Sequence, residues 1–513
     1  MLRLTELKLA LGHGPEALPT AILERLGAPA EDLVGFAVVR RAHDARRKSA
    51  IAMVYSVDVT LRNEAEVLAR FAGDGRVQPT PDAGYRFVAR APEASASRPV
   101  VIGAGPCGLF AGLVLAQMGF RPIILDRGKV VRERTKDTWG LWRRGVLDPE
   151  SNVQFGEGGA GAPPEILTEA KPHIGTFRLV TMVENMRATI EALGGEYRFQ
   201  SRVEDLVIST GPDGERRVRG VVLQGGEHVR SDHIVLAIGH SARDTFQMLL
   251  DRGVHIEAKP FSIGLRIEHP QSLIDRARFG SSAGHPDLGA ADYSLSHHCS
   301  NGRSVYSFCM CPGGTVVAAT SEAGRVVTNG MSQYSRKERN ANAGIVVGVS
   351  PADYPGHPLA GVAMQRHWES RAFAAGGETY AAPGQRVGDF LAGRPSTQLG
   401  AVIPSYRPGV HLTDLAACLP DYATAAIREA LPVFGRQIPG FDMEDAILTG
   451  VETRTSSPVR VGRGRDFESL NTRRLYPAGE GAGYAGGILS AAVDGIKVAE
   501  AVAMSLTSAS QTA

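Results

Sequence analysis

A glycine-rich turn between an apolar strand and a helix constrains this chain more than any other feature. Residues 99–102 (PVVI) predict a buried strand, and the following GAGPCG fits the pattern G-x-G-x-x-G. In that pattern Gly103 makes the tight turn, Gly105 lets backbone approach a pyrophosphate, and Gly108 lets helix and strand pack closely. Pro106 suits the first turn of the helix, whose N-terminal amides and dipole favour phosphate. The segment predicts a dinucleotide-binding unit; the alternative is a glycine-rich turn in an ordinary α/β fold.

An acidic residue stands where the ribose of a dinucleotide would need one. The helix is expected to end at Gly119, and a second apolar strand over residues 122–125 leads to Asp126. Asp126 follows Gly103 by about 20 residues, the spacing of the carboxylate that binds a ribose hydroxyl. The strand, the helix, the second strand and the acid therefore follow one another in the order and at the spacing of a dinucleotide-binding unit. A chance match to the glycine pattern would not be expected to have these neighbours.

The composition is that of a globular protein without a nucleic-acid or membrane signature. Of the 513 residues 43% are hydrophobic, and the formal net charge is only +2. The uncharged run at residues 100–120 is long enough to span a bilayer, but its glycines and proline favour strand, turn and helix. Five sparse cysteines favour a reducing compartment, and the N-terminus shows no secretion signal. We expect a cytoplasmic protein with no membrane partner.

The end of the chain repeats the sequence of strand, glycine-rich turn and helix. Residues 476–480 (YPAGE) predict a short strand that ends in a glycine and an acid, and a long helix is expected from about Gly487. The segment resembles the second FAD motif, in which the acid holds the ribityl chain and the helix N-terminus faces the flavin pyrimidine ring. The positive end of the helix would stabilise an anionic reduced flavin. A helix that only packs on the sheet is the alternative.

Apolar patterns divide the chain into a small N-terminal domain, a linker and a longer discontinuous domain. Residues 1–92 predict the order βαββαβ of a ferredoxin-like sandwich. Its strands are expected at residues 2–9, 34–41, 50–59 and 85–90, and its helices at 15–26 and 63–71. A linker is expected at residues 93–98, and the first part of the FAD-binding domain at 99–254. The inserted domain is expected at 255–450, and the last part of the FAD-binding domain at 451–513.

Motifs spread over nearly the whole length carry a family resemblance. They are RRAHDARRK (40–48), VVIGAGPCGLFAG (100–112), SNVQFGEGGAG (151–161), KPHIGTFRLV (171–180), KPFSIGLRIEHPQ (259–271), YSFCMCPGG (306–314), SRKERNANAGIVVG (335–348), ETRTSSPVR (452–460) and AGEGAGYAGGILSAAVDG (478–495). Together they resemble the bacterial FAD-dependent proteins named NAD(FAD)-utilising dehydrogenases. The resemblance implies an α/β fold: a two-dinucleotide-type FAD-binding Rossmann-like domain with an inserted mixed α+β domain, after the N-terminal ferredoxin-like domain.

The resemblance also implies which residues hold a non-covalent FAD. Asp126 and Arg127 would contact the adenosine ribose, and Val203 would contact the adenine through its backbone. Gly239 would end the strand that returns the chain to the cofactor, and Glu480 would hold the ribityl chain. The complete set expected at the cofactor is Gly103, Gly105, Pro106, Cys107, Gly108, Asp126, Arg127, Gly158, Gly159, Val203, Gly239, Gly479, Glu480, Gly486, Gly487 and Ile488.

The chain departs from the family pattern at one place. After QFGEGGAG the family continues into Ser-Asp-Gly-Lys and a basic helical stretch, whereas here Gly161 runs at once into residues 162–165 (APPE). A block beside the flavin is therefore missing, by natural deletion or as a lost segment. We expect one face of the flavin ring to be more open to water as a result.

Two residues are candidates for catalysis. His240 follows Gly239 and would reach the flavin edge, or would make a hydrogen bond at the end of a loop. Arg454 precedes the C-terminal flavin segment and would hold an anionic substrate or the flavin, or would form a structural ion pair.

No metal site is expected from the sequence. Cys309 and Cys311 form C-x-C on a predicted strand, where alternation would turn both to one face. A redox pair, or half of a metal site with His297 and His298, is possible chemistry, but the C-x-x-C spacing and a second cysteine pair are missing. Two buried small side chains are the favoured explanation.

The motifs favour an FAD-dependent oxidoreductase that passes hydride or electrons through the flavin N5 to a small-molecule substrate or electron acceptor. Besides residues 103–108, the pattern G-x-G-x-x-G recurs only within the FAD segments, at residues 156–161 and 481–486. No glycine fingerprint is left for a separate NAD(P)H domain, so NAD(P)H would dock only transiently as the reductant. The alternative is a flavin-binding regulatory module that contacts RNA or protein through the basic run at residues 40–48. That run contains no stacking aromatic residue and is interrupted by Asp44. A solvated hairpin face is therefore favoured, and no nucleic-acid partner is expected.

Overall fold

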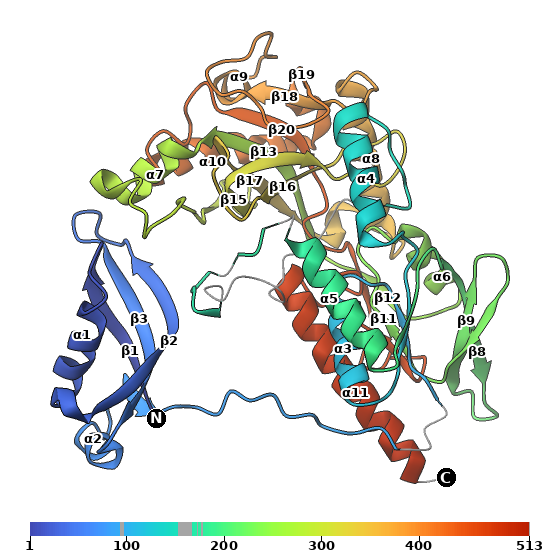
Figure 1. Ribbon diagram of the computed structural model, residues 1–513. Helices are drawn as coiled ribbons and strands as arrows, with labels where there is room; N and C mark the ends of the chain where they lie inside the picture. Colours follow the sequence, from blue (N-terminus) through green and yellow to red (C-terminus); the bar gives the residue numbers. More distant parts are fainter. Residues whose placement is uncertain (93–96, 152–166, 172, 176–177, 512–513) are drawn as a thin grey trace. The chain divides into compact units, whose positions relative to one another are not determined.

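Two compact units make up the part of the chain that the structure describes. The structure is a computed structural model, and it describes residues 1–92, 97–151, 167–171, 173–175 and 178–511 (Figure 1). Unit 1 comprises Met1–Arg86, Ala162–Ile174 and Gln271–Asp292, and unit 2 comprises Phe87–Gly161, Gly175–Pro270 and Tyr293–Ala513. Unit 1 thus includes two later segments, Ala162–Ile174 and Gln271–Asp292, that the sequence pattern assigned to the FAD-binding and inserted domains.

Unit 1 is built on an antiparallel sheet in the order β2-β3-β1-β4. Its elements are β1 Leu2–Ala10, α1 Ala17–Leu26, β2 Leu33–Asp44, β3 Ala52–Leu61, α2 Glu64–Arg70, β4 Val77–Pro79 and, from a later segment, α7 Gln271–Phe279. Every second residue of β3 is buried, as expected for a strand with one face on a core. α1 places Leu18, Ile22 and Leu26 on its buried face, because residues four apart share one side of a helix.

One predicted strand of unit 1 is wrong. The observed order of elements is the predicted βαββαβ, but the last strand is β4, which pairs with β1. Residues 85–90 form no strand. Tyr85 and Phe87 are 49% and 37% exposed, so the apolar alternation there has no sheet face to cover.

Unit 2 contains a five-stranded parallel sheet in the order β22-β11-β5-β6-β7. Its strands are β5 Val100–Ile102, β6 Ile123–Leu125, β7 Glu196–Arg198, β11 Ile234–Leu236 and β22 Leu475–Pro477. The chain moves outward from β5 to β6 and β7, then crosses to the other side of β5 for β11. A ligand crevice is expected beyond the carboxyl ends of β5 and β11, because the strand order reverses there.

Both faces of this sheet are covered. Val101 packs in one core with residues of α3 Pro106–Gln117 and α11 Ile488–Gln511, while Val100 and Ile102 pack in another with β8 Val203–Thr210, β9 Arg216–Leu223, β10 His228–Arg230 and α6 Arg243–Asp251. α5 Leu179–Ala192 lies beside α3, and α3 lies beside α11 (Figure 1). The uncharged run at residues 100–120 is therefore β5, a turn and α3, as predicted. No helix in the described part of the chain has both the length and the apolar character needed to cross a membrane.

An eight-stranded sheet occupies much of the region expected to be inserted. Its path is β14-β15-β17-β13-β20-β18-β19, with β16 paired to β15. Its strands are β13 Phe261–Pro270, β14 Ser296–His298, β15 Ser304–Ala318, β16 Thr328–Ser332, β17 Asn340–Val349, β18 Ala382–Arg386, β19 Val410–Leu412 and β20 Ile447–Glu452. The remaining elements of unit 2 are α4 Val131–Arg144, β12 Ile256–Ala258, α8 Ala360–Ala375, α9 Val387–Ala392, α10 Asp421–Gln437 and β21 Val459–Val461.

A buried cluster of charges links α6 and α8 to the segment after β20. Glu369 of α8 accepts hydrogen bonds from Arg454 Nε and Nη2, both at 3.0 Å, and from Arg243 Nη2 of α6 at 2.7 Å. Gln365 accepts from Arg243 at 3.0 Å, and Thr453 donates to Glu369 at 3.0 Å. Burial alone would raise the pKa of Glu369, but the two guanidinium charges hold it well below its usual value. The carboxylate is therefore charged and fully paired.

Removing the charge of Glu369 should destabilise unit 2 strongly. Glu369→Gln leaves the buried Arg454 without a carboxylate and Arg243 with Glu322 alone, which costs about 3–5 kcal/mol in free energy of unfolding. Glu322→Gln is the matched control, because Glu322 pairs with Arg243 and Arg366 but its side chain is 20% exposed. Urea unfolding followed by circular dichroism measures both variants. Equal losses in the two variants would show that the buried cluster has no special role.

Candidate functional site

Three glycines of the first turn have three different surroundings. Gly103 has a φ of 99°, and a Cβ there would lie 2.6 Å from the Ala237 carbonyl oxygen. A Cβ on Gly108 would lie 1.8 Å from the Gly103 carbonyl oxygen, so this residue allows the helix to approach the strand. Gly105 has an ordinary φ of −71°, and a Cβ there would meet no atom within 4 Å. The open glycine is the one that the pattern assigns to pyrophosphate, and Pro106 begins α3 as predicted.

Asp126 lies beside this turn at the end of β6. Its carboxylate accepts hydrogen bonds from the backbone of Ala104 at 2.8 Å and of Gly128 at 2.7 Å. Arg127, expected to contact the ribose, is paired with Glu150 at 2.8 Å and with Asp244 at 3.0 Å. The hydrogen bonds that Arg127 donates to Glu150, together with the charge of Asp244, raise the pKa of Arg127. The structure therefore fixes Asp126 at the glycine turn, while the guanidinium of Arg127 is engaged by carboxylates.

The second glycine turn packs against the first turn of α3. Gly479 follows β22 with a φ of 73°, and a Cβ there would lie 2.8 Å from the Cβ of Cys107. Gly479 also donates its backbone N–H to Asp494 at 2.7 Å, and Asp494 pairs with Arg463 at 2.6 Å. Burial raises the pKa of the Cys107 thiol, which packs in the core. Only the backbone of Cys107 remains suited to binding phosphate.

His240 and Glu480 meet where β11 and β22 end. The two strands are parallel neighbours, so their carboxyl ends lie at the same edge of the sheet. His240 Nδ1 lies 2.9 Å from Glu480 Oε1, and the His240 and Glu480 side chains are 6% and 24% exposed. Because a carboxylate only accepts, Nδ1 is the donor in this contact. The second ring nitrogen, Nε2, is buried without a hydrogen-bond partner among the described residues.

Open glycines precede His240 and the start of α11. Gly239 precedes His240, and Gly486 and Gly487 precede Ile488, the first residue of α11. A Cβ on any of these three glycines would meet no atom within 4 Å. The site thus offers two helix N-termini, open glycines beside both, a carboxylate at each turn and an imidazole nitrogen that no described residue pairs. These features fit a dinucleotide with a polar ring system at its second end.

Comparison with known proteins settles the family. Residues 260–455 match the family described as FAD-dependent protein, C-terminal domain-like, and residues 1–60 match a domain of unknown function, DUF8436. An uncharacterised protein of Clostridium beijerinckii is 45% identical over 528 residues, which cover 97% of this chain and 98% of that protein. The chain belongs to the bacterial FAD-dependent protein family. FAD is therefore its cofactor, as the motifs predicted.

Two solved structures resemble this FAD-dependent protein at low identity. A geranylgeranyl bacteriochlorophyll reductase-like protein of Thermoplasma acidophilum is 14% identical with a TM-score of 0.37, covering 80% of this chain and 79% of that chain. CtdE in complex with FAD is 11% identical with a TM-score of 0.31, covering 81% of this chain and 89% of that chain.

The roles predicted for Val203, Gly158 and Gly159 at the cofactor of this FAD-dependent protein stay predictions. Val203 begins β8 and is buried opposite Leu223, so its contact with adenine stays a prediction. Gly158 and Gly159 lie outside the described residues, and so does the departure from the family pattern at residues 162–165. The expected opening of one flavin face also stays a prediction.

Arg454, one of the two catalytic candidates, occupies a structural position. Its Nε and Nη2 bind Glu369, and its Nη1 donates to Ser241 at 3.0 Å and to Ser321. Every guanidinium nitrogen therefore has a partner inside the protein. The structure favours the ion-pair interpretation over a direct contact with substrate or flavin.

The expected common face for Cys309 and Cys311 is wrong. The pairing of β15 with β17 shifts register between Phe308 and Cys311, which breaks the strict alternation of the strand. Cys309 is exposed with a φ of 45°, whereas Cys311 is buried. The Cys309 carbonyl oxygen accepts a hydrogen bond from Arg266 Nη1 at 2.7 Å, and this bond helps to hold the irregular backbone at Cys309.

Two glycine variants should separate FAD binding from folding. Gly105→Val has room within the protein and should fold, but its side chain fills the place expected for the pyrophosphate. We predict that its FAD affinity falls at least about tenfold, a loss of about 1.4 kcal/mol. Gly108→Val meets the Gly103 carbonyl and should lose the fold itself. Flavin absorbance per chain and circular dichroism check both variants, and a folded Gly105→Val protein with full FAD would contradict the assignment.

Proposed function

We propose that this FAD-dependent protein is an oxidoreductase that transfers hydride or electrons between a small-molecule substrate and an acceptor. Bound FAD supplies the redox chemistry at its N5. One observation carries the proposal: His240 Nε2, a buried imidazole nitrogen with no partner among the described residues, stands at the joint carboxyl edge of β11 and β22, next to the open Gly239. His233 and His269 are also buried with one ring nitrogen unpaired among the described residues, but of the three only His240 follows the carboxyl end of a strand of the parallel sheet.

The chain's own residues have distinct parts in this proposal. The N-terminus of α3 and Gly105 bind the pyrophosphate, and Asp126 orients the adenosine ribose. Glu480 holds the proton of His240 on Nδ1, so that Nε2 is free to accept a proton or, in the charged ring, to donate one. The N-terminus of α11 provides a positive end that favours negative charge on the nearby ring. His240 is thus the proposed proton carrier, with Glu480 as its positioning residue.

The FAD-binding domain is proposed to be of the two-dinucleotide type. Its parallel strand order reverses beside β5, and its cofactor segments come from opposite ends of unit 2. Outside the segments assigned to FAD the sequence offers no further glycine fingerprint, so NAD(P)H would act as a transient reductant that docks over the flavin.

Reduction under anaerobic conditions tests the oxidoreductase proposal. The photoreduced holoprotein should be reoxidised by one class of acceptor much faster than free reduced FAD is. His240→Asn should keep its FAD and slow that step by about 100-fold or more, the usual contribution of a positioned acid or base. His228→Asn is the control, because His228 is exposed on β10. The proposal would be contradicted if no acceptor reoxidised the reduced holoprotein faster than it reoxidises free reduced FAD. An unchanged reoxidation rate in His240→Asn would exclude His240 as the proton carrier.

Unit 1 is proposed to be a ferredoxin-like sandwich without a nucleic-acid function. Its basic hairpin is partly neutralised from within: Arg41 pairs with Asp287 at 2.8 Å and Glu169 at 3.7 Å. Asp44 pairs with Arg46 at 2.7 Å and Lys8 at 3.1 Å. These contacts leave fewer charges available for phosphate than the sequence alone suggests.

Neutralising the hairpin should therefore leave RNA retention unchanged. The variant replaces four arginines by serine: Arg40, Arg41, Arg46 and Arg47. Gel-shift titration with single-stranded RNA at low and moderate salt measures any binding, because electrostatic binding weakens steeply as salt rises. Salt-sensitive RNA binding that disappears in the variant would support the interaction-module alternative instead.

A further inference from the structure

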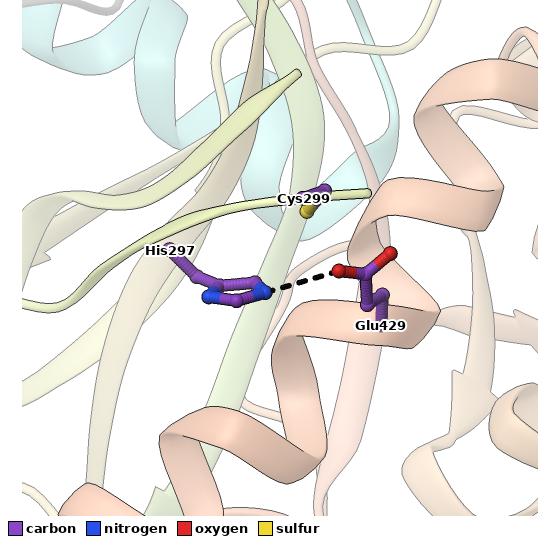
Figure 2. A group of neighbouring side chains, drawn as sticks. All are labelled: His297, Cys299 and Glu429. Atoms are coloured by element: carbon purple, nitrogen blue, oxygen red, sulfur yellow. Dashed lines mark hydrogen bonds and ion pairs between the residues drawn. The ribbon is translucent and has the colours of Figure 1, made fainter. Parts of the chain in front are cut away.

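Three side chains with different donor atoms converge in unit 2, away from the residues assigned to FAD. They are His297 of β14, Cys299 in the turn that follows it, and Glu429 of α10 (Figure 2). One ligand atom from each lies within 4.8 Å of the other two. The His297 ring points toward the Glu429 carboxylate, and its Nε2 lies 3.1 Å from Glu429 Oε1.

The donor set is characteristic of one kind of cation. A thiol sulfur, an imidazole nitrogen and a carboxylate oxygen together suit zinc, whereas calcium and magnesium prefer oxygen alone. In a tetrahedral zinc site, bonds of about 2.0–2.3 Å separate the ligand atoms by about 3.3–3.8 Å. The spacing here is close enough that small side-chain rotations would bring all three atoms to one ion.

Neighbouring groups hold the proposed ligands in place. Ser300 donates its backbone N–H to Glu429 Oε1 at 2.9 Å and its hydroxyl to Oε2 at 2.6 Å. The Cys299 thiol points toward the Ala426 carbonyl oxygen at 3.4 Å, one turn before Glu429 on α10. Such outer contacts orient metal ligands and account for much of a site's affinity.

The three proposed ligands differ in solvent exposure, with the cysteine buried and the other two partly exposed. Cys299 is 3% exposed, while the His297 and Glu429 side chains are 24% and 34% exposed. The sulfur is therefore protected from oxidants, and an ion can still enter from the side of the histidine and the carboxylate. Three protein ligands leave a fourth position for water.

We propose that His297, Cys299 and Glu429 bind a zinc ion that fastens the β14–β15 hairpin to α10. This site is independent of the proposed redox function. Its effect is to cross-link two segments that lie about 130 residues apart in the sequence, and metal binding to the folded state adds to stability. Without an ion, the same residues would form only a hydrogen-bonded link between hairpin and helix.

Metal analysis of the full-length holoprotein tests the site. Protein equilibrated with zinc and desalted should carry one zinc per chain, measured by mass spectrometry. Cys299→Ser, His297→Ala and Glu429→Gln should each lower zinc affinity at least about 100-fold, the upper end of what losing even an outer-shell partner costs. His298→Ala is the matched control, because alternation turns His298 to the opposite face, where it contacts Ser304 at 3.2 Å.

A second measurement identifies the sulfur directly. The absorbance spectrum of the cobalt-loaded holoprotein, after subtraction of the spectrum of the zinc-loaded holoprotein, should show a thiolate-to-cobalt charge-transfer band. This band should be lost in Cys299→Ser and kept in His298→Ala. Flavin absorbance per chain reports whether each variant is folded, since the FAD residues are untouched. Absence of stoichiometric zinc, or zinc and cobalt signals that survive in folded Cys299→Ser, would overturn the proposal.

Discussion

Close backbone contact between the first turn of α3 and the C-terminal segment is the constraint on which the cofactor site depends. A Cβ on Gly495 of α11 would lie 2.2 Å from the Cys107 carbonyl oxygen, and one on Gly479 would lie 2.8 Å from the Cys107 side chain. Only glycine permits this approach. It brings together two segments that are separated by most of unit 2, and each contributes a turn and a helix N-terminus to the same edge of the sheet.

The long chain between these two segments is held by contacts of its own. The eight-stranded sheet forms its own hydrogen-bonded framework, and the buried Arg243–Glu369–Arg454 cluster ties its helix α8 to α6 of the nucleotide-binding part. Since a buried charge is costly once it loses its partner, this cluster resists rearrangements that would separate α8 from α6. The turns predicted to hold FAD are thus supported by neighbouring elements of unit 2.

Local features of the fold could be predicted from sequence, whereas long-range pairings could not. The glycine fingerprint specifies strand, turn and helix within a few residues, and the structure follows it closely. The meeting of His240 with Glu480 and the partners of Arg454 depend on strand order, which no local pattern encodes. The wrong strand at residues 85–90 and the wrong common face of Cys309 and Cys311 have one physical reason. Alternation predicts a face only where a strand pairs in regular register.

A crystal structure of the protein purified with its natural cofactor tests the central claim most directly. The account predicts one FAD per chain, with its pyrophosphate against Gly105 and the N-terminus of α3, and its flavin end beside Glu480 and Gly487. FAD bound at another edge of the sheet, or a different nucleotide between these two turns, would contradict it.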